Sequence, residues 1–150
     1  MLDIVRTDSK NKDFIKLVKL LDSYLAEKDG DDHLFYDQFN KIDHLNYVIV
    51  AYRNRFPFGC GAIKEFSSGI IEVKRMFTQA EFRGQKIASI VLSELENWAR
   101  ELNYTKCILE TGKKQIEAIE LYKKNGYSLI PNYGQYQNVD NSLCFEKYIS

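Results

Sequence analysis

The sequence predicts an α/β protein (α+β) in which helices flank a mixed, mostly antiparallel, twisted sheet. Three apolar, strand-like runs separated by short polar turns occupy residues 47–78, the pattern of an antiparallel meander. A long helical repeat of apolar residues then separates this meander from another β-rich run at 106–111. A crossover of this length places the strand at 106–111 parallel to the strand at 70–78.

Length and composition favour a single domain over residues 1–150. A chain of 150 residues, 45% of them hydrophobic, can bury a core without disulfides or metals. Its 21 basic and 21 acidic residues balance, so no overall field favours nucleic acid or an acidic membrane surface. No apolar run is long enough to cross a bilayer, and the N-terminus lacks a signal-peptide pattern. We therefore expect a cytoplasmic protein without nucleic-acid or membrane partners.

The three cysteines, Cys60, Cys107 and Cys144, each lie inside an apolar, strand-like run. This placement indicates reduced core thiols. No Cys-x-x-Cys pair and no His/Cys cluster with metal-ligand spacing occurs, so no metal is expected. A nucleophilic cysteine is the less favoured alternative, because no evident cation would lower the pKa of such a thiol.

The N-terminal half is predicted to hold two helices and four strands. A strand at 2–6 precedes a helix that Asp8 or Ser9 can cap and that ends near Glu27. A turn at 29–32 leads into a short aromatic helix at 33–39. Strands at 47–53 and 58–65, joined by a turn at 54–57, should pair as a hairpin, and the strand at 70–78 completes the meander.

The C-terminal half begins with a long predicted helix at 84–103, whose apolar residues recur at the helical period. A strand at 106–111 and a shorter helix at 115–125 follow, and Gly126 ends that helix. Two more strands are expected at 127–130 and 143–149. A polar loop that carries aromatic residues joins them.

The change from strand period to helix period falls at Arg83-Gly84-Gln85-Lys86. A strand that enters a helix through such a turn directs free backbone N–H groups, and the positive end of the helix dipole, toward one spot. The turn is therefore a candidate phosphate site. The alternative is an ordinary polar turn before a helix.

Two ordered motifs together resemble the GCN5-related N-acetyltransferase (GNAT) family. The acetyl-CoA signature of that family is Arg or Gln, two residues, Gly, one residue, then Gly or Ala; Arg83 to Ala88 fit it except for Lys86, where glycine is usual. A second signature places Asn three residues before Ala, then Leu-Tyr and a final Gly-Phe or Gly-Tyr. Gln115 takes the Asn position, and the remaining matches are Ala118, Leu121, Tyr122, Gly126 and Tyr127.

The resemblance implies splayed fourth and fifth strands with the pantetheine arm of acetyl-CoA between them. It implies main-chain contacts from Arg75, Met76 and Phe77, with Gln115 near the pantetheine. For the side chain of Arg75, a solvated or ion-paired role is the alternative. The residues implied for the pyrophosphate are Arg83, Gly84, Gln85, Lys86, Ile87 and Ala88.

Tyr122 and Glu72 are the catalytic candidates. A tyrosine with the ordinary pKa of about 10 is protonated at pH 7, so Tyr122 suits protonation of the leaving thiolate; a core tyrosine is the alternative. Glu72 lies 11 residues before Arg83, the spacing at which related histone acetyltransferases place their catalytic glutamate. Glu72 could equally pair with Lys74 on the same strand face, and many relatives deprotonate the amine through ordered water.

The acceptor site is expected between two aromatic segments. His33 and Tyr36 belong to the predicted short helix, and Tyr133 and Tyr136 to the loop before the last strand; packing over the sheet is the alternative for the tyrosines. We expect acetyl transfer from acetyl-CoA to a primary amine of a small molecule, amino-acid-like or an amine metabolite. A protein or peptide amine, a non-catalytic CoA sensor and a cofactor-free interaction module are alternatives. A homodimer is expected from the resemblance only.

Overall fold

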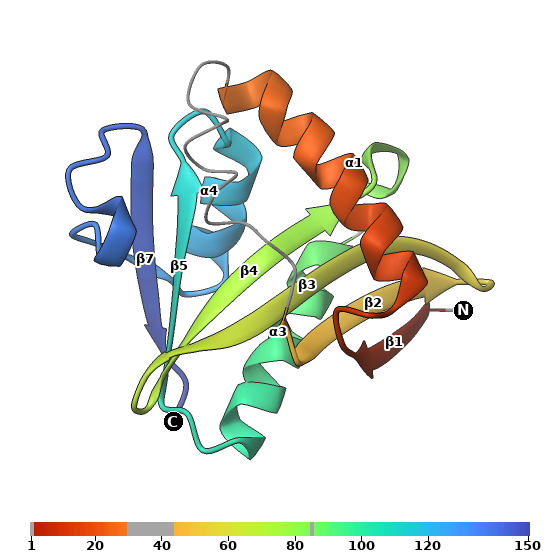
Figure 1. Ribbon diagram of the computed structural model, residues 1–150, viewed down its shortest axis with the longest axis horizontal. Coiled ribbons are helices and arrows are strands. Elements are labelled where there is room, and N and C mark those ends of the chain that lie inside the picture. The colour runs from red at the N-terminus through yellow and green to blue at the C-terminus, as the bar shows by residue number, and fades with distance from the viewer. Residues whose placement is uncertain (1, 30–43, 85) are drawn as a thin grey trace.

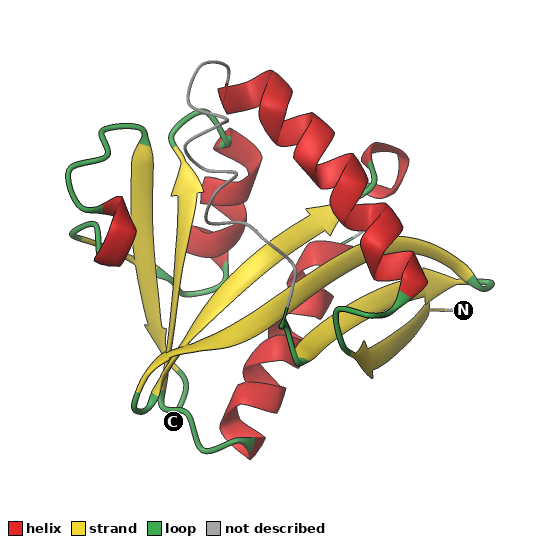
Figure 2. Ribbon diagram, viewed as in Figure 1, coloured by secondary structure: helices red, strands yellow, loops and turns green. Residues whose placement is uncertain are grey.

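Helices cover both faces of a twisted sheet in the computed structural model, which describes residues 2–29, 44–84 and 86–150 (Figure 1). The strands that it describes lie in the order β1-β2-β3-β4-β5-β7-β6. Only the β4–β5 pair is parallel among them. The predicted class, a mixed and mostly antiparallel sheet flanked by helices, is confirmed (Figure 2). The predicted helix at 33–39, with His33 and Tyr36, and residue Gln85 lie outside the described residues.

Strand β1 (Leu2–Thr7) leads into helix α1 (Lys12–Asp29). The cap of this helix differs from the prediction. Asn11 Oδ1 accepts the backbone N–H of Phe14 at 2.9 Å, the geometry of an N-cap residue. Asp8 instead accepts the N–H of Lys10 in the preceding turn. The apolar face of α1 packs on β2 and β3 through Phe14, Leu17, Val18, Val48, Val50, Cys60 and Ala62.

The predicted meander consists of β2 (Tyr47–Arg53), β3 (Phe56–Ser67) and β4 (Ile70–Thr78). Strand β3 begins two residues earlier than predicted, because the turn contains only Asn54 and Arg55. These residues have φ of +50° and +68°, as both central residues of a type I′ hairpin turn do. The bounds of β2 and β4 agree with the prediction.

A bulge interrupts β4. Two of its residues, Arg75 and Met76, face the single residue Gly61 of β3. Arg75 adopts a φ of +58°, which is uncommon for a residue with a side chain. A Cβ on Gly61 would lie 2.6 Å from the sulfur of Met76 and 2.8 Å from Cδ1 of Leu95, so a side chain there would force these two side chains to shift. A bulge leaves one residue out of the hydrogen-bond ladder and bends its strand.

Strands β4 and β5 (Lys106–Gly112) separate after a short parallel contact. Their pairing joins Ile70–Glu72 to Lys106–Ile108 and then stops. Figure 1 shows the two strands diverging beyond that point. Strand β7 (Ser142–Tyr148) pairs along β5, and β6 (Ser128–Ile130) pairs with the outer edge of β7. The predicted splay of these two strands is confirmed.

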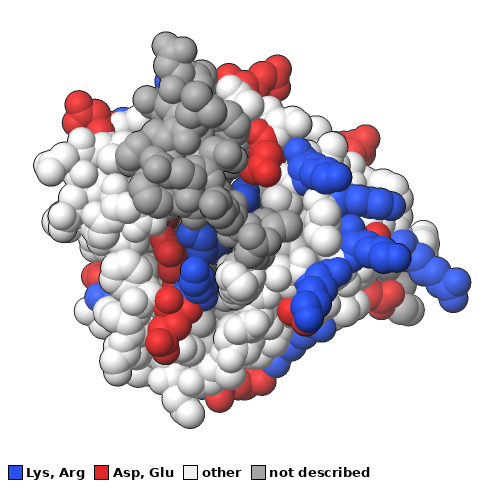
Figure 3. Space-filling view, in the orientation of Figure 1, with Lys and Arg blue, Asp and Glu red and all other residues white. Residues whose placement is uncertain are grey.

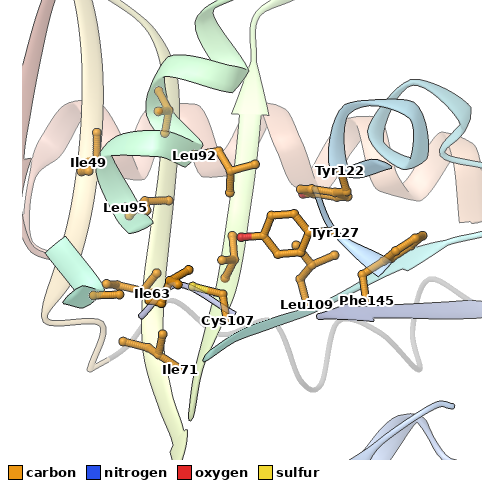
Figure 4. Packing of buried hydrophobic residues seen from close by; sticks show 14 of the residues in the cluster. Ile49, Ile63, Ile71, Leu92, Leu95, Cys107, Leu109, Tyr122, Tyr127 and Phe145 are labelled. Carbon is orange, nitrogen blue, oxygen red and sulfur yellow. The ribbon is translucent and has the colours of Figure 1, made fainter. Parts of the chain in front are cut away.

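Helices α3 (Ile87–Glu101) and α4 (Ile116–Lys124) lie on the face of the sheet opposite α1 (Figure 1). The core between α3 and the sheet is closely packed, with Tyr122 and Tyr127 at the α4 side (Figure 4). Among the described residues, no helix is long and apolar enough to cross a membrane. The described part of this core includes Ile49, Ile63, Ile71, Val91, Leu92, Leu95, Leu109 and Phe145.

Cys60, Cys107 and Cys144 are buried and free of disulfides, as predicted. Burial raises the pKa of Cys60 and of Cys107 to about 12, and that of Cys144 to about 11. A thiol with such a pKa is protonated at pH 7 and a poor nucleophile. The alternative of a nucleophilic cysteine is therefore disfavoured.

Candidate active site

A cavity of about 690 Å³ lies where β4 and β5 diverge. Val73 lines it and belongs to the core under α3. Lys74 also lines it and pairs with Ala62, which packs under α1. Neighbouring residues of a strand point to opposite faces of the sheet. The cavity therefore borders both faces of the sheet.

The turn before α3 forms one end of the cavity. Gly84 has a φ of +85°, and open space surrounds the position of its missing Cβ. Lys86 is the N-cap residue of α3 and has a φ of +64°. A left-handed conformation costs a residue with a side chain about 1–2 kcal/mol, which explains why glycine suits this position. The lysine keeps the turn conformation at that cost.

Arg83 links three elements at the edge of the cavity. Its Nε donates to the carbonyl of Thr78 at 3.0 Å, and its guanidinium lies 4.8 Å from the ring centroid of Tyr24 on α1. A weaker ion pair of 3.8 Å joins it to Glu117 on α4. The cation is therefore held beside the turn.

Strand β4 supplies the wall next to the turn, through Arg75, Met76 and Phe77. The side chain of Arg75 is ion-paired with Asp22 of α1 at 2.7 Å and only 4% exposed. The ion-paired alternative therefore holds for this side chain. Arg75 and Met76, the two residues of the bulge, both line the cavity.

Two carboxylates line the side of the cavity that faces α1. Glu72 is buried; its Oε2 accepts the hydroxyl of Tyr133 at 2.6 Å, and its Oε1 lies 3.7 Å from Lys74 Nζ. Glu110 of β5 accepts the hydroxyl of Ser142 at 2.6 Å. Glu110 is not among the site residues predicted from the sequence. Its place follows from the register of β4 and β5 in the structure, because Ile108 pairs with Glu72 and residues two apart share a face.

The 3-10 helix η3 (Gly134–Tyr136) and its N-cap residue Tyr133 lie beside these carboxylates. Burial, followed by the charges of Glu110 and Glu72, raises the pKa of Tyr136, which lines the cavity. Burial and Glu72 raise the pKa of Tyr133. Both hydroxyls therefore stay protonated over the usual pH range. Tyr133 also packs edge-on against Phe66 at 5.1 Å, so it combines packing with a hydrogen bond to the site.

Tyr122 enters the cavity from α4 and is 6% exposed. Burial and the charge of Glu110 raise the pKa of its hydroxyl, and no hydrogen bond to a described residue contributes. The Nε2 of Gln115 and the Oγ1 of Thr78 are buried without a partner among the described residues, and both side chains line the cavity. Unsatisfied buried polar groups are costly, so these two suit a polar ligand.

The structure gathers most of the candidate residues at this one cavity. His33, Tyr36 and Gln85 lie outside the described residues, and Tyr133 reaches the cavity through Glu72. Figure 3 shows the face of the molecule that carries α1. Acidic and basic residues lie side by side near its middle, and basic residues lie over α1. The lining includes the expected residues Glu72, Arg75, Met76, Phe77, Arg83, Gly84, Lys86, Ile87, Ala88, Gln115, Tyr122 and Tyr136.

Comparison with known proteins identifies the class of this fold and site. Residues 14–127 match the family described as the acetyltransferase (GNAT) family. A protein named IAA acetyltransferase from Azospirillum brasilense is 35% identical over 136 residues, which cover 89% of this chain and 88% of the relative. The chain therefore belongs to the GNAT family of acetyltransferases, enzymes that use acetyl-CoA as acetyl donor.

Solved structures agree with this assignment. A Klebsiella pneumoniae protein, provisionally described as an acyl-CoA N-acyltransferase, superposes with a TM-score of 0.84 at 27% identity, over 100% of this chain and 99% of that chain. The PaiA N-acetyltransferase of Thermoplasma acidophilum, solved in complex with coenzyme A, gives a TM-score of 0.71 at 16% identity over 99% of both chains. The second likeness concerns the fold alone.

Proposed function

We propose that the protein transfers the acetyl group of acetyl-CoA directly to the primary amine of a small, positively charged acceptor. The observation that carries this proposal is the cavity at the β4–β5 gap. It borders the α3 turn at one end and the carboxylates of Glu72 and Glu110 on the α1 side. The donor and the acceptor can therefore meet at the gap from opposite faces of the sheet.

The α3 end of the cavity suits the donor, acetyl-CoA. The turn offers backbone N–H groups at a helix N-terminus, with Gly84 open to close approach. Arg83 and Lys86 add positive charge for the pyrophosphate. Gln115 and Thr78 offer buried polar atoms that lack partners among the described residues, and these suit the polar pantetheine. The coenzyme A complex of the Thermoplasma relative supports a donor site in this fold.

The α1 side of the cavity suits a cationic acceptor. Among the described residues that line this side, Glu72 and Glu110 carry negative charges and Lys74 carries a positive one. The positive charge of Arg75 is balanced by its ion pair with Asp22. The net charge of these described residues is negative, which attracts an ammonium group and disfavours a carboxylate. This favours an amine metabolite over an amino acid.

The side chains present suit the proton transfers of the reaction. The amine nitrogen forms a bond to the thioester carbonyl carbon, and the carbon–sulfur bond breaks. Glu72 takes the proton of the amine, and the bulged β4 backbone polarises the carbonyl. Tyr122 gives its proton to the departing thiolate, and the second proton of the nitrogen, released as the amide forms, restores the proton of Tyr122. Burial, followed by the charge of Glu110, raises the pKa of Tyr122, so its hydroxyl carries the proton that the thiolate needs at pH 7.

An amine screen tests this proposal. Acetyl-CoA-dependent thiol release should be measured with acceptors that differ by one carboxylate, such as 1,5-diaminopentane with lysine and tryptamine with tryptophan. We expect the amine of each pair to react faster than the amino acid. No release above hydrolysis with any amine, or faster reaction of the amino acids, would contradict the proposal.

Replacing Glu110 with glutamine should raise the KM for the best diamine about tenfold, the equivalent of about 1.4 kcal/mol. The substitution removes one negative charge that attracts the acceptor, while Gln can still accept the hydroxyl of Ser142. The KM for free lysine as acceptor should rise less than the KM for the diamine. Glu65→Gln is the matched control, because Glu65 also accepts a hydrogen bond from a hydroxyl, that of Tyr104, but lies at the surface. Equal KM values for Glu110→Gln and parent would remove Glu110 from acceptor binding.

Two substitutions at Lys86 separate charge from backbone. We expect Lys86→Gln, which keeps the left-handed residue and removes the ammonium, to weaken acetyl-CoA binding about fivefold, or about 1 kcal/mol. Lys86→Gly should weaken binding equally and leave the melting temperature unchanged or higher, because the strain at φ +64° is relieved. Calorimetric titration gives the affinities. Tighter binding by Lys86→Gly would show that the lysine obstructs the turn.

A further inference from the structure

Glu96 is a buried carboxylate on α3 that none of the proposed steps uses. It is 4% exposed on a helix face that is otherwise aliphatic. Its Oε2 accepts the hydroxyl of Tyr127 at 2.8 Å, and its Oε1 accepts Lys147 Nζ at 2.8 Å. An apolar group of similar shape often stabilises a core as well as a buried ion pair does. Stability alone therefore gives little reason for this trio of Glu96, Tyr127 and Lys147.

Tyr127 connects the trio to Tyr122 in two ways. Its backbone N–H donates to the carbonyl of Tyr122 at 3.0 Å, across a turn in which Gly126 has a φ of +90°. Its ring meets the ring of Tyr122 edge to face, with 5.8 Å between centroids. Figure 4 shows the two rings next to each other at the α4 side of the core. A displacement of Tyr127 therefore displaces Tyr122.

Tyr122 depends on such packing for its position. Its hydroxyl has no hydrogen bond to a described residue, and its ring is held by contacts that include Tyr127 and Phe145. A general acid must lie within about 2.6–3.2 Å of the atom that it protonates. Small errors in ring position therefore reduce proton transfer more than they reduce ligand binding.

We propose that Glu96 is a positioning residue for acetyl transfer: through its hydrogen bond to Tyr127, it fixes the ring of Tyr122 in the cavity. This inference rests on the acid role proposed for Tyr122. The same helix carries Lys86 at its N-terminus, so α3 aligns the donor turn with the acid. Burial raises the pKa of Tyr127, so its hydroxyl remains a donor throughout the working pH range.

A double-mutant cycle tests the inference. Tyr127→Phe and Glu96→Gln are made alone and combined with Tyr122→Phe, and kcat is measured by thiol release with the best acceptor of the amine screen, or with water. Each single change should lower kcat about tenfold and leave the KM for acetyl-CoA within about twofold. In the Tyr122→Phe background neither should lower kcat further, although both should still lower the melting temperature. Ile49→Val, in the same core on β2, is the control for lost stability.

Fluorine NMR of protein labelled with 3-fluorotyrosine gives a readout without turnover. The signal of Tyr122, identified by its loss in Tyr122→Phe, should shift or broaden in Tyr127→Phe and Glu96→Gln and stay unchanged in Ile49→Val. An unchanged signal overturns the inference, as do unchanged kcat values or losses that add to that of Tyr122→Phe. If Tyr122→Phe itself retains full kcat, the acid role fails and the inference fails with it.

Discussion

Replacement of Tyr122 with phenylalanine should lower kcat about 100-fold or more, within the range for loss of a general acid. Acetyl-CoA affinity should change less than about twofold, because the hydroxyl is needed only when the thiolate leaves. The ring remains, so its packing against Tyr127 and Phe145 is preserved. Initial rates of thiol release and calorimetric titration give the two quantities.

The pH dependence of the parent enzyme bears on the same role. Burial and Glu110 raise the pKa of Tyr122 above the ordinary value of about 10. The protonated form of Tyr122 is the active form. Deprotonation of this hydroxyl should therefore not lower the rate between pH 7 and pH 10. The matched control for Tyr122→Phe is Tyr104→Phe, which removes a hydroxyl that donates to Glu65 at the surface. Equal kcat in Tyr122→Phe and parent would exclude Tyr122 as the acid.

Replacement of Glu72 with glutamine should lower kcat/KM about 100-fold and change its dependence on pH, because the amide cannot accept the amine proton. The fold should persist, since a glutamine oxygen can still accept the hydroxyl of Tyr133. Lys74 loses its 3.7 Å ion pair in this variant. Full pH–rate profiles of variant and parent provide the measurement.

Glu146→Gln is the matched control for Glu72. Glu146 lies on the neighbouring part of the sheet, opposite Ile108, and pairs with Lys106 at 3.2 Å. It does not belong to the described lining of the cavity. We expect its profile to match that of the parent. A Glu72→Gln profile that overlaps the parent profile would assign deprotonation of the amine to another group or to water.

The sequence predicted the strands and helices well where periodicity and turns were clear. The bounds of β2 and β4 agree with the prediction, and α3 and α4 differ from it only near their ends. The prediction of Asp8 or Ser9 as the N-cap of α1 was wrong. Asp8, Ser9 and Asn11 are all good capping residues, and only the path of the backbone selects Asn11.

The details that shape the cavity depend on tertiary structure. Arg75 adopts a φ of +58° although its sequence gives no sign of a turn; the bulge lies opposite Gly61, and the side chain of Arg75 pairs with Asp22 of α1, contacts that exist only in the folded protein. Tyr133 and Glu72 are 61 residues apart and meet only when β4 and the loop before β7 are assembled. Lys86 was the exception: its departure from the family signature marked a residue with a left-handed φ of +64° in the turn before α3.

A single-turnover experiment with acetyl-CoA labelled in its acetyl group tests direct transfer most directly. Enzyme, labelled acetyl-CoA and the best amine are mixed. The masses of the intact protein and of the small molecules are then measured by mass spectrometry at early times. We predict label in the N-acetylated amine, formed at the rate of thiol release, and a protein mass that never increases. An acetylated protein that forms before the product, or label that never reaches an amine, would contradict direct transfer across the β4–β5 gap.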